Sequence, residues 1–426
     1  MTEATSEISA GEWSSTLPAT RAQELRMPAL LQRRELKMSR DAHAFVRGST
    51  EQFYEWLAAN SSGIPAGPVI WICGDAHVGN LGPIGKTDAR VEVELRDLDQ
   101  TVPGNPAHDL IRLALSLSMA ARSSDLPGVV TARLIEELMG GYLDAILDSS
   151  TDASPHDSAA VRFVVRQALR RKWRHLRRER IGSKVRFPLG QRFLRLVDDE
   201  WEAVEHFLDK DRIRKLVTRL DSRDDDARIK ILDAAYWVKG CSSLGLWRCA
   251  VVVEVQSREP AVSDFALLDI KEAPQSVAAS AERGNVPRHQ GERVVQGATA
   301  LSPGLGERIL AATLLDREVF VREQLPQDLK VELETLDDVE ARATSRALAM
   351  IVGRAHARQL DESTRRSWGT ELKRAATRSL EAPGWLWSTV VDLIGVHERA
   401  YLEHCRRYAL AEEKAREAAD ESTDTV

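Results

Sequence analysis

The chain has 426 residues, a formal net charge of −6, 43% hydrophobic residues and 29% charged residues. This composition is typical of a globular protein, and the length predicts two lobes or domains rather than one small core. The acidic net charge gives no reason to expect nucleic acid or a membrane surface as a partner.

The cysteines and the apolar runs predict a cytoplasmic protein. The four cysteines are scattered without a C-x-x-C pair, which is typical of reduced thiols rather than of a disulfide framework. No signal peptide opens the chain, and its most apolar helix-like run, LIRLALSLSMAA, is short and contains Arg112. We therefore predict no membrane-spanning segment.

The beginning of the chain predicts a mostly helical unit with a few strands. Residues 1–25 are expected to be disordered because they are poor in groups that a core could bury. Residues 39–59 predict one or two helices with Ser39 as a cap. The apolar run at 69–73 predicts a buried strand, and the alternation of apolar and charged residues at 89–99 predicts a half-buried one.

Two helices are predicted next. The first follows Asn105, which is expected to cap it, and has Pro106 in its first turn. The second covers residues 130–148 and is weakened in its middle by Gly140 and Gly141.

Residues 162–195 contain 13 Lys or Arg residues and one acidic residue, Glu179. They fit either a surface for phosphates or an acidic partner, or an Arg-rich helix with an apolar inner face. Helical spacing favours the second interpretation, in which these side chains pack inward: Phe163, Val165, Leu169, Trp173 and Leu176.

After residue 235 the sequence predicts strands rather than helices. The glycine–serine loop GCSSLG, at 240–245, precedes a strand at 247–255, and a second strand at 265–270 ends at Lys271. The later predicted elements are a strand at 318–325, helices at 341–359 and within 384–415, and a disordered acidic tail at 413–426.

Polar side chains gather just past the two strands of the first region. The loop GDAHVGN carries Asp75, His77 and Asn80, and the segment RDLD carries Asp97 and Asp99. Hard carboxylate and amide oxygens are the ligands that Mg²⁺ prefers, whereas thiolate and imidazole are not.

These segments together match the needs of one reaction. Phosphoryl transfer from ATP requires a group that orients the acceptor hydroxyl, oxygen ligands for Mg²⁺, a backbone cradle for the phosphates and a lysine on them. The two polar segments offer the first two, and the glycine–serine loop with Lys271 offers the others. We therefore predict a phosphotransferase that uses ATP and Mg²⁺ (or Mn²⁺).

The segment GDAHVGNLG…VEVELRDLDQTVPGNPAHDL resembles the catalytic region of kinase-like small-molecule phosphotransferases of the aminoglycoside phosphotransferase type. From about residue 38 to residue 356 the chain more closely resembles the uncharacterised bacterial family called domain of unknown function 2252, which is grouped with kinase-like proteins. The motifs that carry the resemblance are FVRG, GDAHVGN, DLDQT, the loop-strand-strand-KEA block, GERVVQG and GRAHAR.

The resemblance implies a role for each matching residue of the polar segments. Asp75 matches the catalytic Asp, Asn80 the metal-binding Asn, and Asp97 the metal-binding Asp. His77 acts either in acid–base catalysis or as a structural hydrogen-bonding residue. Asp99 is either a second metal ligand or a turn residue.

The resemblance also implies a nucleotide side of the site. Lys271 matches the phosphate-binding lysine, and Gly240 and Gly245 match the outer glycines of the phosphate loop. Ser242 stands where a middle glycine is common, and Ser243 completes the loop.

The remaining residues of the motifs are assigned supporting roles on helices, or no role. Glu292 in GERVVQG is the candidate ion-pair partner of the lysine, unless Gln296 occupies that place. Asp109 is expected to tether its helix to the GDAHVGN loop, and His356 to pack at a helix end. Arg47 of FVRG has no assigned role.

For the fold, the resemblance implies an α+β, protein-kinase-like two-lobed architecture. Its order is circularly permuted, because the glycine loop and lysine follow the catalytic Asp instead of preceding it. A helix-rich large lobe is assigned to 26–150 and 336–412, a small antiparallel sheet lobe that binds the nucleotide to 231–335, and a basic helical insert to 151–230. Permutation is tolerable because a fold depends on which elements pack together.

Two other functions stay open. One is a catalytically idle kinase-like module that binds nucleotide, which the substituted loop glycine would fit. The other is a dinuclear metallophosphoesterase with Asp75 and His77 as a D-x-H ligand pair, although no second GD motif follows. The sequence indicates neither the phosphate acceptor, a small molecule or a protein, nor the oligomeric state.

Overall fold

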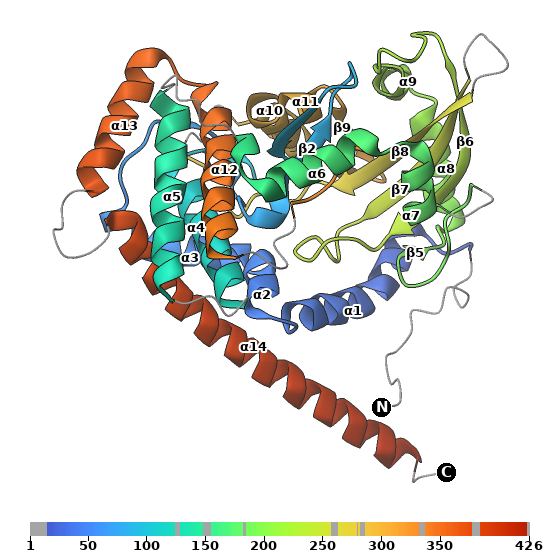
Figure 1. The fold of residues 1–426 in the computed structure, drawn as a ribbon. Coiled ribbons are helices and arrows are strands. Elements are labelled where there is room, and N and C mark those ends of the chain that lie inside the picture. Colours follow the sequence, from blue (N-terminus) through green and yellow to red (C-terminus); the bar gives the residue numbers. More distant parts are fainter. Residues whose placement is uncertain are drawn as a thin grey trace.

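The computed structural model describes residues 15–123, 128–147, 155–181, 185–256, 263–278, 280–281, 286–331, 337–376 and 384–423. Helices on one side and a large antiparallel sheet on the other make up the fold (Figure 1). The predicted α+β class is therefore confirmed. None of the described helices combines the length and the apolar character needed to cross a membrane.

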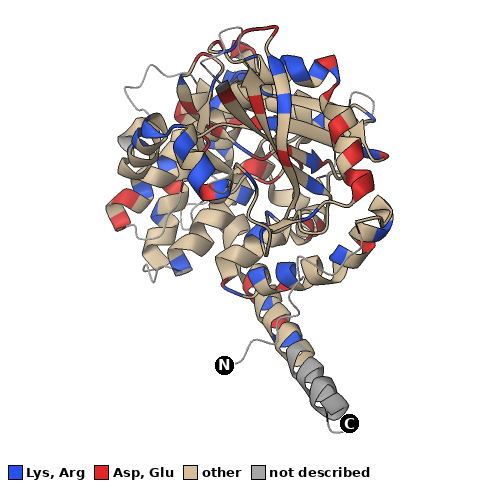
Figure 2. Cartoon of the chain, turned by 90° about the vertical axis from the view of Figure 1, so that its right-hand side faces the viewer, with Lys and Arg blue, Asp and Glu red and all other residues tan. Residues whose placement is uncertain are grey.

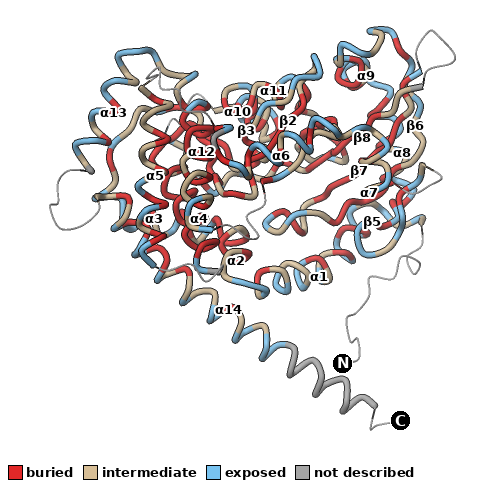
Figure 3. The backbone as a smooth tube through the Cα atoms, in the orientation of Figure 1, coloured by how far each residue is buried: buried red, intermediate tan, exposed pale blue. Residues whose placement is uncertain are grey.

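The helical part is centred on three helices, α4 (Ala107–Ser123), α5 (Gly128–Leu147) and α12 (Asp338–Ala357). Leu138 and Leu348 are fully buried in its apolar cluster, and Figure 3 shows that much of α4 and α12 is buried. The outer helices of this part are α2 (Ala42–Gly48), α3 (Thr50–Ala59), α13 (Glu362–Ala376) and α14 (Trp385–Thr423).

Glycines let α5 and α12 pack at close range. A Cβ atom on Gly141 would lie 2.3 Å from the backbone oxygen of Arg346, and one on Gly353 would lie 2.7 Å from the Cβ atom of Ala145. The glycine pair that weakens α5 as an isolated helix is thus what permits its contact with α12.

Gly141→Ala is expected to destabilise the protein, because the added methyl group meets backbone rather than a movable side chain. We expect the free energy of unfolding to fall by about 1–3 kcal/mol, as is typical of overpacking. The matched control is Gly395→Ala in α14, where a Cβ atom meets nothing within 4 Å. That change should stabilise by up to about 1 kcal/mol through helix propensity. Equal stability of the two variants in urea unfolding would contradict the close packing.

The large sheet has six strands within the described residues, in the order β5-β6-β7-β8-β10-β9, and all neighbours are antiparallel. The predicted strands correspond to β7, β8 and β10, whereas β5, β6 and β9 were not predicted. The predicted basic helical insert at 151–230 supplies β5 and the start of β6 as well as helices. The strands are β5 (Phe193–Leu194), β6 (Arg228–Trp237), β7 (Arg248–Gln256), β8 (Ser263–Glu272), β9 (Ile309–Leu314) and β10 (Arg317–Gln324).

Both faces of this sheet are covered. Val251 and Val253 of β7 pack into one apolar cluster, and Val252 between them packs into another on the opposite face. Because successive strand residues point to opposite faces, a strand buried on both sides reads as a continuous apolar run, as CAVVV does. The helices that contribute to these clusters are α7 (Trp173–Arg180), α8 (Asp198–Leu208), α9 (Asp211–Val217) and, through Leu30, α1 (Ala19–Met38).

Smaller elements connect the sheet to the helical part. Helix α10 (Gln290–Leu301) contacts β9 and β10 of the sheet and also the short strand β1. The other connecting elements are β1 (Ile70–Ile72) paired with β4 (Val102–Gly104), the hairpin β2 (Leu81–Gly85) with β3 (Val91–Leu95), α6 (Ala159–Arg170), α11 (Pro303–Gly306), and the 3-10 turns Ser61–Gly63, Val78–Asn80 and Pro155–Asp157.

The prediction that residues 1–25 are disordered is wrong for their last part, because α1 (Ala19–Met38) begins there. Residues 1–14 lie outside the described residues. Arg26 of α1 is fully buried and pairs with the buried Glu200 at 2.6 Å. A buried charge pair of this kind is a tertiary contact that local composition does not indicate.

The predicted disordered tail at 413–426 is also wrong as far as Thr423, where α14 ends. Its sequence is rich in Ala, Glu, Lys and Arg, which are strong helix formers, so the helix continues through it. Residues 424–426 lie outside the described part of the chain.

The inward face of α6 differs from the prediction. Phe163 and Leu169 are 62% and 60% exposed, and the helix instead buries Val161, Val164 and Ala168. A shift of one residue turns the face of a helix by about 100°, which is enough to exchange the two sets. The other three residues of that prediction pack against apolar clusters.

Two local predictions are corrected as well. The cap of α2 is Asp41, whose carboxylate accepts the Ala44 N–H at 2.7 Å, and not Ser39. On β3, Glu94 is buried rather than solvated, because it accepts a hydrogen bond from the Ser302 hydroxyl at 2.6 Å. Burial raises the pKa of this carboxyl.

Candidate functional site

One pocket of about 430 Å³ brings both polar segments and the glycine–serine loop together. Most of the predicted site residues line it: Asp75, His77, Asn80, Asp97, Asp99, Gly240, Ser242 and Ser243. Lys271 lies behind the lining and reaches two of these carboxylates. Gly245 and Glu292 are not part of the lining.

The loop that carries Asp75 is fixed by its neighbours. Gly74 has φ +75°, and a Cβ atom there would lie 2.2 Å from the backbone oxygen of Gln100, so only glycine fits. The buried carboxylate of Asp109 accepts the Cys73 and Gly74 N–H groups at 2.7 and 3.0 Å. The predicted tether between α4 and this loop is therefore present, and His356 is 3.1 Å from the same carboxylate.

Asp75 is buried and paired with Arg112, a residue that the sequence interpretation did not include in the site. Arg112 Nε donates to Asp75 Oδ1 at 2.9 Å, and the same guanidinium donates to the Val46 carbonyl and the Thr50 hydroxyl. Burial raises the pKa of Asp75, although Arg112 opposes the shift. The side chain is thus oriented and more basic than an ordinary aspartate.

His77 lies next to Asp75, with Nε2 3.8 Å from Asp75 Oδ2. Burial, together with the charges of Arg112 and Arg47, holds the pKa of His77 well below its usual value, so the ring is neutral near pH 7. Its Nδ1 is buried without a hydrogen-bond partner among the described residues. At that nitrogen, therefore, His77 does not make the hydrogen bond that a structural role would require.

Asn80 connects the two polar segments. Its Oδ1 accepts the backbone N–H of Asp97 at 2.6 Å, and its Nδ2 donates to the Asp97 carbonyl, also at 2.6 Å. Asn80 therefore positions the backbone of Asp97, in addition to any metal-binding role. This double hydrogen bond joins the loop at Asn80 to the segment that carries Asp97.

Lys271 is almost completely buried beneath the pocket. Its Nζ donates to Asp99 Oδ2 at 2.6 Å and to Asp97 Oδ1 at 3.3 Å. Burial disfavours every charge in this group, but Lys271, Arg322 and Arg248 outweigh it at Asp97 and lower the pKa of that carboxyl. At Asp99, burial and the charge of Asp97 prevail and raise the pKa.

The residues fit a magnesium site with few protein ligands. Among the described residues, no three His, Cys, Asp or Glu side chains gather as a metal-binding group. Mg²⁺, however, is commonly held by only one or two carboxylates plus phosphates and water. Asp97 can serve in that way, because 44% of its side chain is exposed at the pocket.

The predicted ion pair between Lys271 and Glu292 is not formed. Glu292 is exposed at the start of α10, and the lysine pairs with the two aspartates instead. The neighbouring Arg293 faces the site: it donates to the carbonyls of Asp99 and Thr101 at 2.8 and 2.6 Å. Glu292 and Arg293 are neighbours on the helix, so their side chains point about 100° apart around its axis. Arg293, and not Glu292, is the one that points inward.

The glycine–serine loop forms the other wall. Gly240 has φ +98°, and a Cβ atom there would lie 2.2 Å from Ser243 Oγ, so glycine is needed at this position. Lys37 of α1 donates to the Gly240 carbonyl at 2.7 Å and ties the loop to the first helix. Gly245, with φ +106°, lies beside α1, where its carbonyl accepts from Gln23.

Asp269 anchors the basic side chains of the sheet wall. It is fully buried, and Arg248 and Arg322 donate to it at 2.5 and 3.2 Å. Lys239 lies 3.9 Å from the same carboxylate, and burial together with the charge of Arg248 holds the pKa of Lys239 well below its usual value.

Eight Lys or Arg side chains and four Asp side chains line the pocket as a whole. Over the chain as a whole, basic and acidic residues both occur along the helices and strands (Figure 2).

A family model described as "Uncharacterized protein conserved in bacteria (DUF2252)" matches residues 26–407. The chain belongs to this family. The matched span contains both walls of the pocket and all of the predicted site residues. No curated protein and no solved structure matched the chain.

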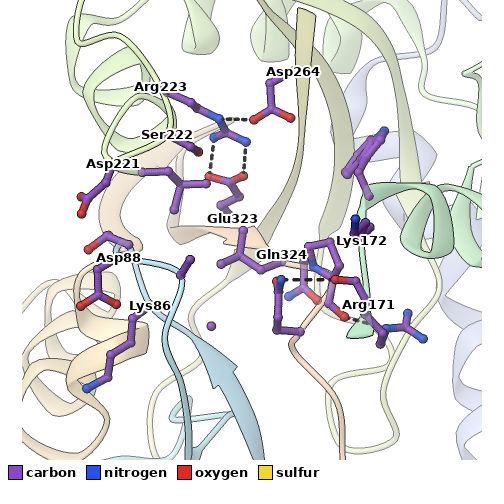
Figure 4. A pocket seen from close by; sticks show the side chains of 18 of the residues that line it. Lys86, Asp88, Arg171, Lys172, Asp221, Ser222, Arg223, Asp264, Glu323 and Gln324 are labelled. Atoms are coloured by element: carbon purple, nitrogen blue, oxygen red, sulfur yellow. Dashed lines mark hydrogen bonds and ion pairs between the residues drawn. The ribbon is translucent and has the colours of Figure 1, made fainter. Parts of the chain in front are cut away.

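This DUF2252 protein has a second hollow, of about 460 Å³, near the turn between β2 and β3. Figure 4 shows that the buried Arg223 of this hollow is already paired, with Asp264 and with Glu323. Arg171 at its edge is paired with Glu179. Because these groups satisfy one another, the hollow offers less free hydrogen-bonding capacity than the first pocket.

Proposed function

We propose that this protein is an ATP- and Mg²⁺-dependent phosphotransferase with a kinase-like site. The observation that carries the proposal is the shared pocket, in which Asp75 and Asp97 of the helical part face the loop at 240–243 of the sheet part. The lysine behind them is within 3.3 Å of Asp97. These are the parts that phosphoryl transfer requires.

The sheet wall is suited to the phosphates. The loop lines the pocket and has a positive-φ glycine at Gly240, and backbone N–H groups of such loops are suited to donate to phosphate oxygens. Lys271 is held in place by two carboxylates, and Arg248 and Arg322 are held by Asp269. A bound Mg²⁺ would supply charge neutralisation at the triphosphate, with Asp97 as its protein ligand.

The helical wall is suited to the acceptor. Arg112 fixes one oxygen of Asp75, and the other faces His77. In the proposed reaction the acceptor oxygen bonds to the γ-phosphorus, the bond to the ADP oxygen breaks, and the acceptor proton passes to Asp75. The raised pKa of Asp75 favours this role, because a stronger base accepts the proton more readily.

The proposal includes a permuted kinase-like architecture. Separate apolar clusters, one in the helical part and one on each face of the sheet, support two lobes with the site between them. The sheet lobe with Lys271 follows Asp75 in the chain, which is the permuted order. In place of the usual helix glutamate, two aspartates hold the lysine, and Arg293 of α10 fixes the backbone beside them.

An idle nucleotide-binding module is the second candidate function. It is favoured by the double hydrogen bond of Asn80, whose oxygen already accepts the Asp97 N–H. Measured phosphate transfer or ATP hydrolysis separates this candidate from the enzyme, because both bind nucleotide.

Asp97→Ala is expected to remove metal-dependent nucleotide affinity while the protein stays folded, since Lys271 keeps Asp99 as a partner at 2.6 Å. We expect at least about a tenfold loss, which corresponds to about 1.4 kcal/mol. Calorimetric titration with ATP, with and without Mg²⁺, measures it. The control is Asp211→Ala, an exposed carboxylate on α9 far from the lining. Equal metal-dependent affinity with and without Asp97 would overturn the metal assignment.

A further inference from the structure

Arg47, in the last turn of α2, reaches over the loop that carries Asp75. Its Nη1 lies 3.5 Å from the position that a Cβ atom on Gly79 would occupy, and the His77 ring is 3.3 Å from the same point. Gly79 thus leaves open a space that Arg47 and His77 border together. All three residues line the pocket.

Two buried nitrogen atoms beside this space have no hydrogen-bond partner among the described residues. Within the described residues, Arg47 makes no ion pair, and its Nε is buried without a hydrogen-bond partner. His77 Nδ1, beside it, is also buried and unpaired. Buried polar atoms without partners are costly, so an arrangement of this kind is typical of a site completed by a ligand.

The local charge is positive. Arg112, Arg47 and Lys330 all act on His77, and their charges help to keep its ring neutral. Asp75 offsets Arg112, with which it is paired at 2.9 Å, but no described carboxylate pairs with Arg47. An anion is therefore the group that this part of the pocket would attract most strongly.

This space lies on the helical side of the pocket. Lys271 and the glycine–serine loop border the pocket from the sheet, whereas Arg47, His77 and Gly79 border it from the helical part, on the Asp75 loop. A magnesium-bound triphosphate on the sheet wall would offset only part of the excess of eight basic over four acidic side chains in the lining.

We propose that the phosphate acceptor is a small molecule that itself carries an anionic group, a phosphate or a carboxylate, which Arg47 binds next to Asp75. The inference rests on the proposed phosphotransferase function. Arg47 holds the anion by paired N–H donors, as guanidinium groups do with planar or tetrahedral oxyanions, and so turns a nearby hydroxyl of the acceptor toward Asp75. Arg47 is then a substrate-binding residue, and it assigns a role to the FVRG motif.

The test measures anion binding to the full-length protein loaded with Mg²⁺ and a non-hydrolysable ATP analogue. Inorganic phosphate and acetate are titrated separately, so that the stronger of the two identifies the anion. Arg47→Gln should weaken binding of that anion by about tenfold or more, while changing the affinity for the ATP analogue less than about twofold. The matched control is Arg366→Gln, which removes one exposed positive charge on α13 and should change neither affinity.

The outcomes separate this inference from the proposed function. If Arg47→Gln weakens the ATP analogue as much as the small anion, Arg47 belongs to the nucleotide site and the inference is wrong, although the phosphotransferase proposal stands. If neither anion binds the wild-type protein more tightly than it binds Arg47→Gln, the inference is wrong as well. If the wild-type protein binds no nucleotide, the proposed function fails; the anion titrations without nucleotide then still decide whether Arg47 binds an anion.

Discussion

Replacing Asp75 with asparagine is expected to slow phosphate transfer by about 10²–10⁴-fold, the range that a positioned general base contributes. The side chain keeps its shape, and Arg112 can still donate to its oxygen, so the loop geometry should persist. The group that accepts the acceptor proton is lost. Nucleotide affinity should change little, because Lys271 and the glycine–serine loop lie on the other wall.

Single-turnover phosphate transfer measures this effect, or slow ATP hydrolysis until the acceptor is known. His77→Gln is the paired variant, since its ring is neutral and 3.8 Å from the Asp75 carboxylate. It should slow the reaction much less. Removing the charge next to the buried Arg112 weakens the fold somewhat, so rates are compared well below the unfolding midpoint of each variant. Near-normal turnover of Asp75→Asn together with loss of turnover in His77→Gln would contradict the kinase-like mechanism.

Asp269→Asn is expected to lower the free energy of unfolding by about 3–5 kcal/mol, as when one partner of a buried charge pair is removed. Asp269 is fully buried and forms ion pairs with Arg248, Arg322 and Lys239. Without its charge, the buried Arg248 and Arg322 lose their carboxylate partner, and the pocket loses the arrangement of these two basic side chains. Urea unfolding at neutral pH and nucleotide titration measure the two consequences.

The control for this effect is Asp211→Asn. Asp211 forms an exposed pair with Lys215, and exposed pairs contribute about 0–1 kcal/mol. The wild-type contribution of Asp269 also has a defined pH dependence: its basic partners hold its pKa below the ordinary value. The contribution is therefore complete above the pKa of an unfolded aspartate, and it decreases as the pH falls through the lower folded value. If Asp269→Asn and Asp211→Asn lowered the free energy of unfolding by the same amount, the buried cations would not depend on Asp269.

Local patterns predicted the parts of the site that depend on neighbours in the sequence. The strand before Gly74, the loop with Asp75 and the strand that leads to Lys271 follow from apolar runs and glycines. Their convergence in one pocket was expected only through the resemblance, because no sequence period indicates which loops meet in space. The structure supplies that juxtaposition for most of the predicted residues.

Buried charged residues were the main omissions. Arg112 interrupts an apolar helix and reads as an exposed residue, but its three acceptors come from other segments. Arg293 is adjacent to the predicted Glu292, and only the packing of α10 decides which of them faces inward. Strand β6 was missed because a register shift between Ile231 and Asp233 interrupts its alternation.

The most direct test of the account is a crystal structure of the protein with Mg²⁺ and a non-hydrolysable ATP analogue. The account predicts the triphosphate between Lys271 and the loop at 240–243, with the metal on the Asp97 carboxylate and the terminal phosphate facing Asp75. A nucleotide bound in the hollow beside Arg223, or no nucleotide at concentrations that saturate ordinary kinase-like enzymes, would contradict it.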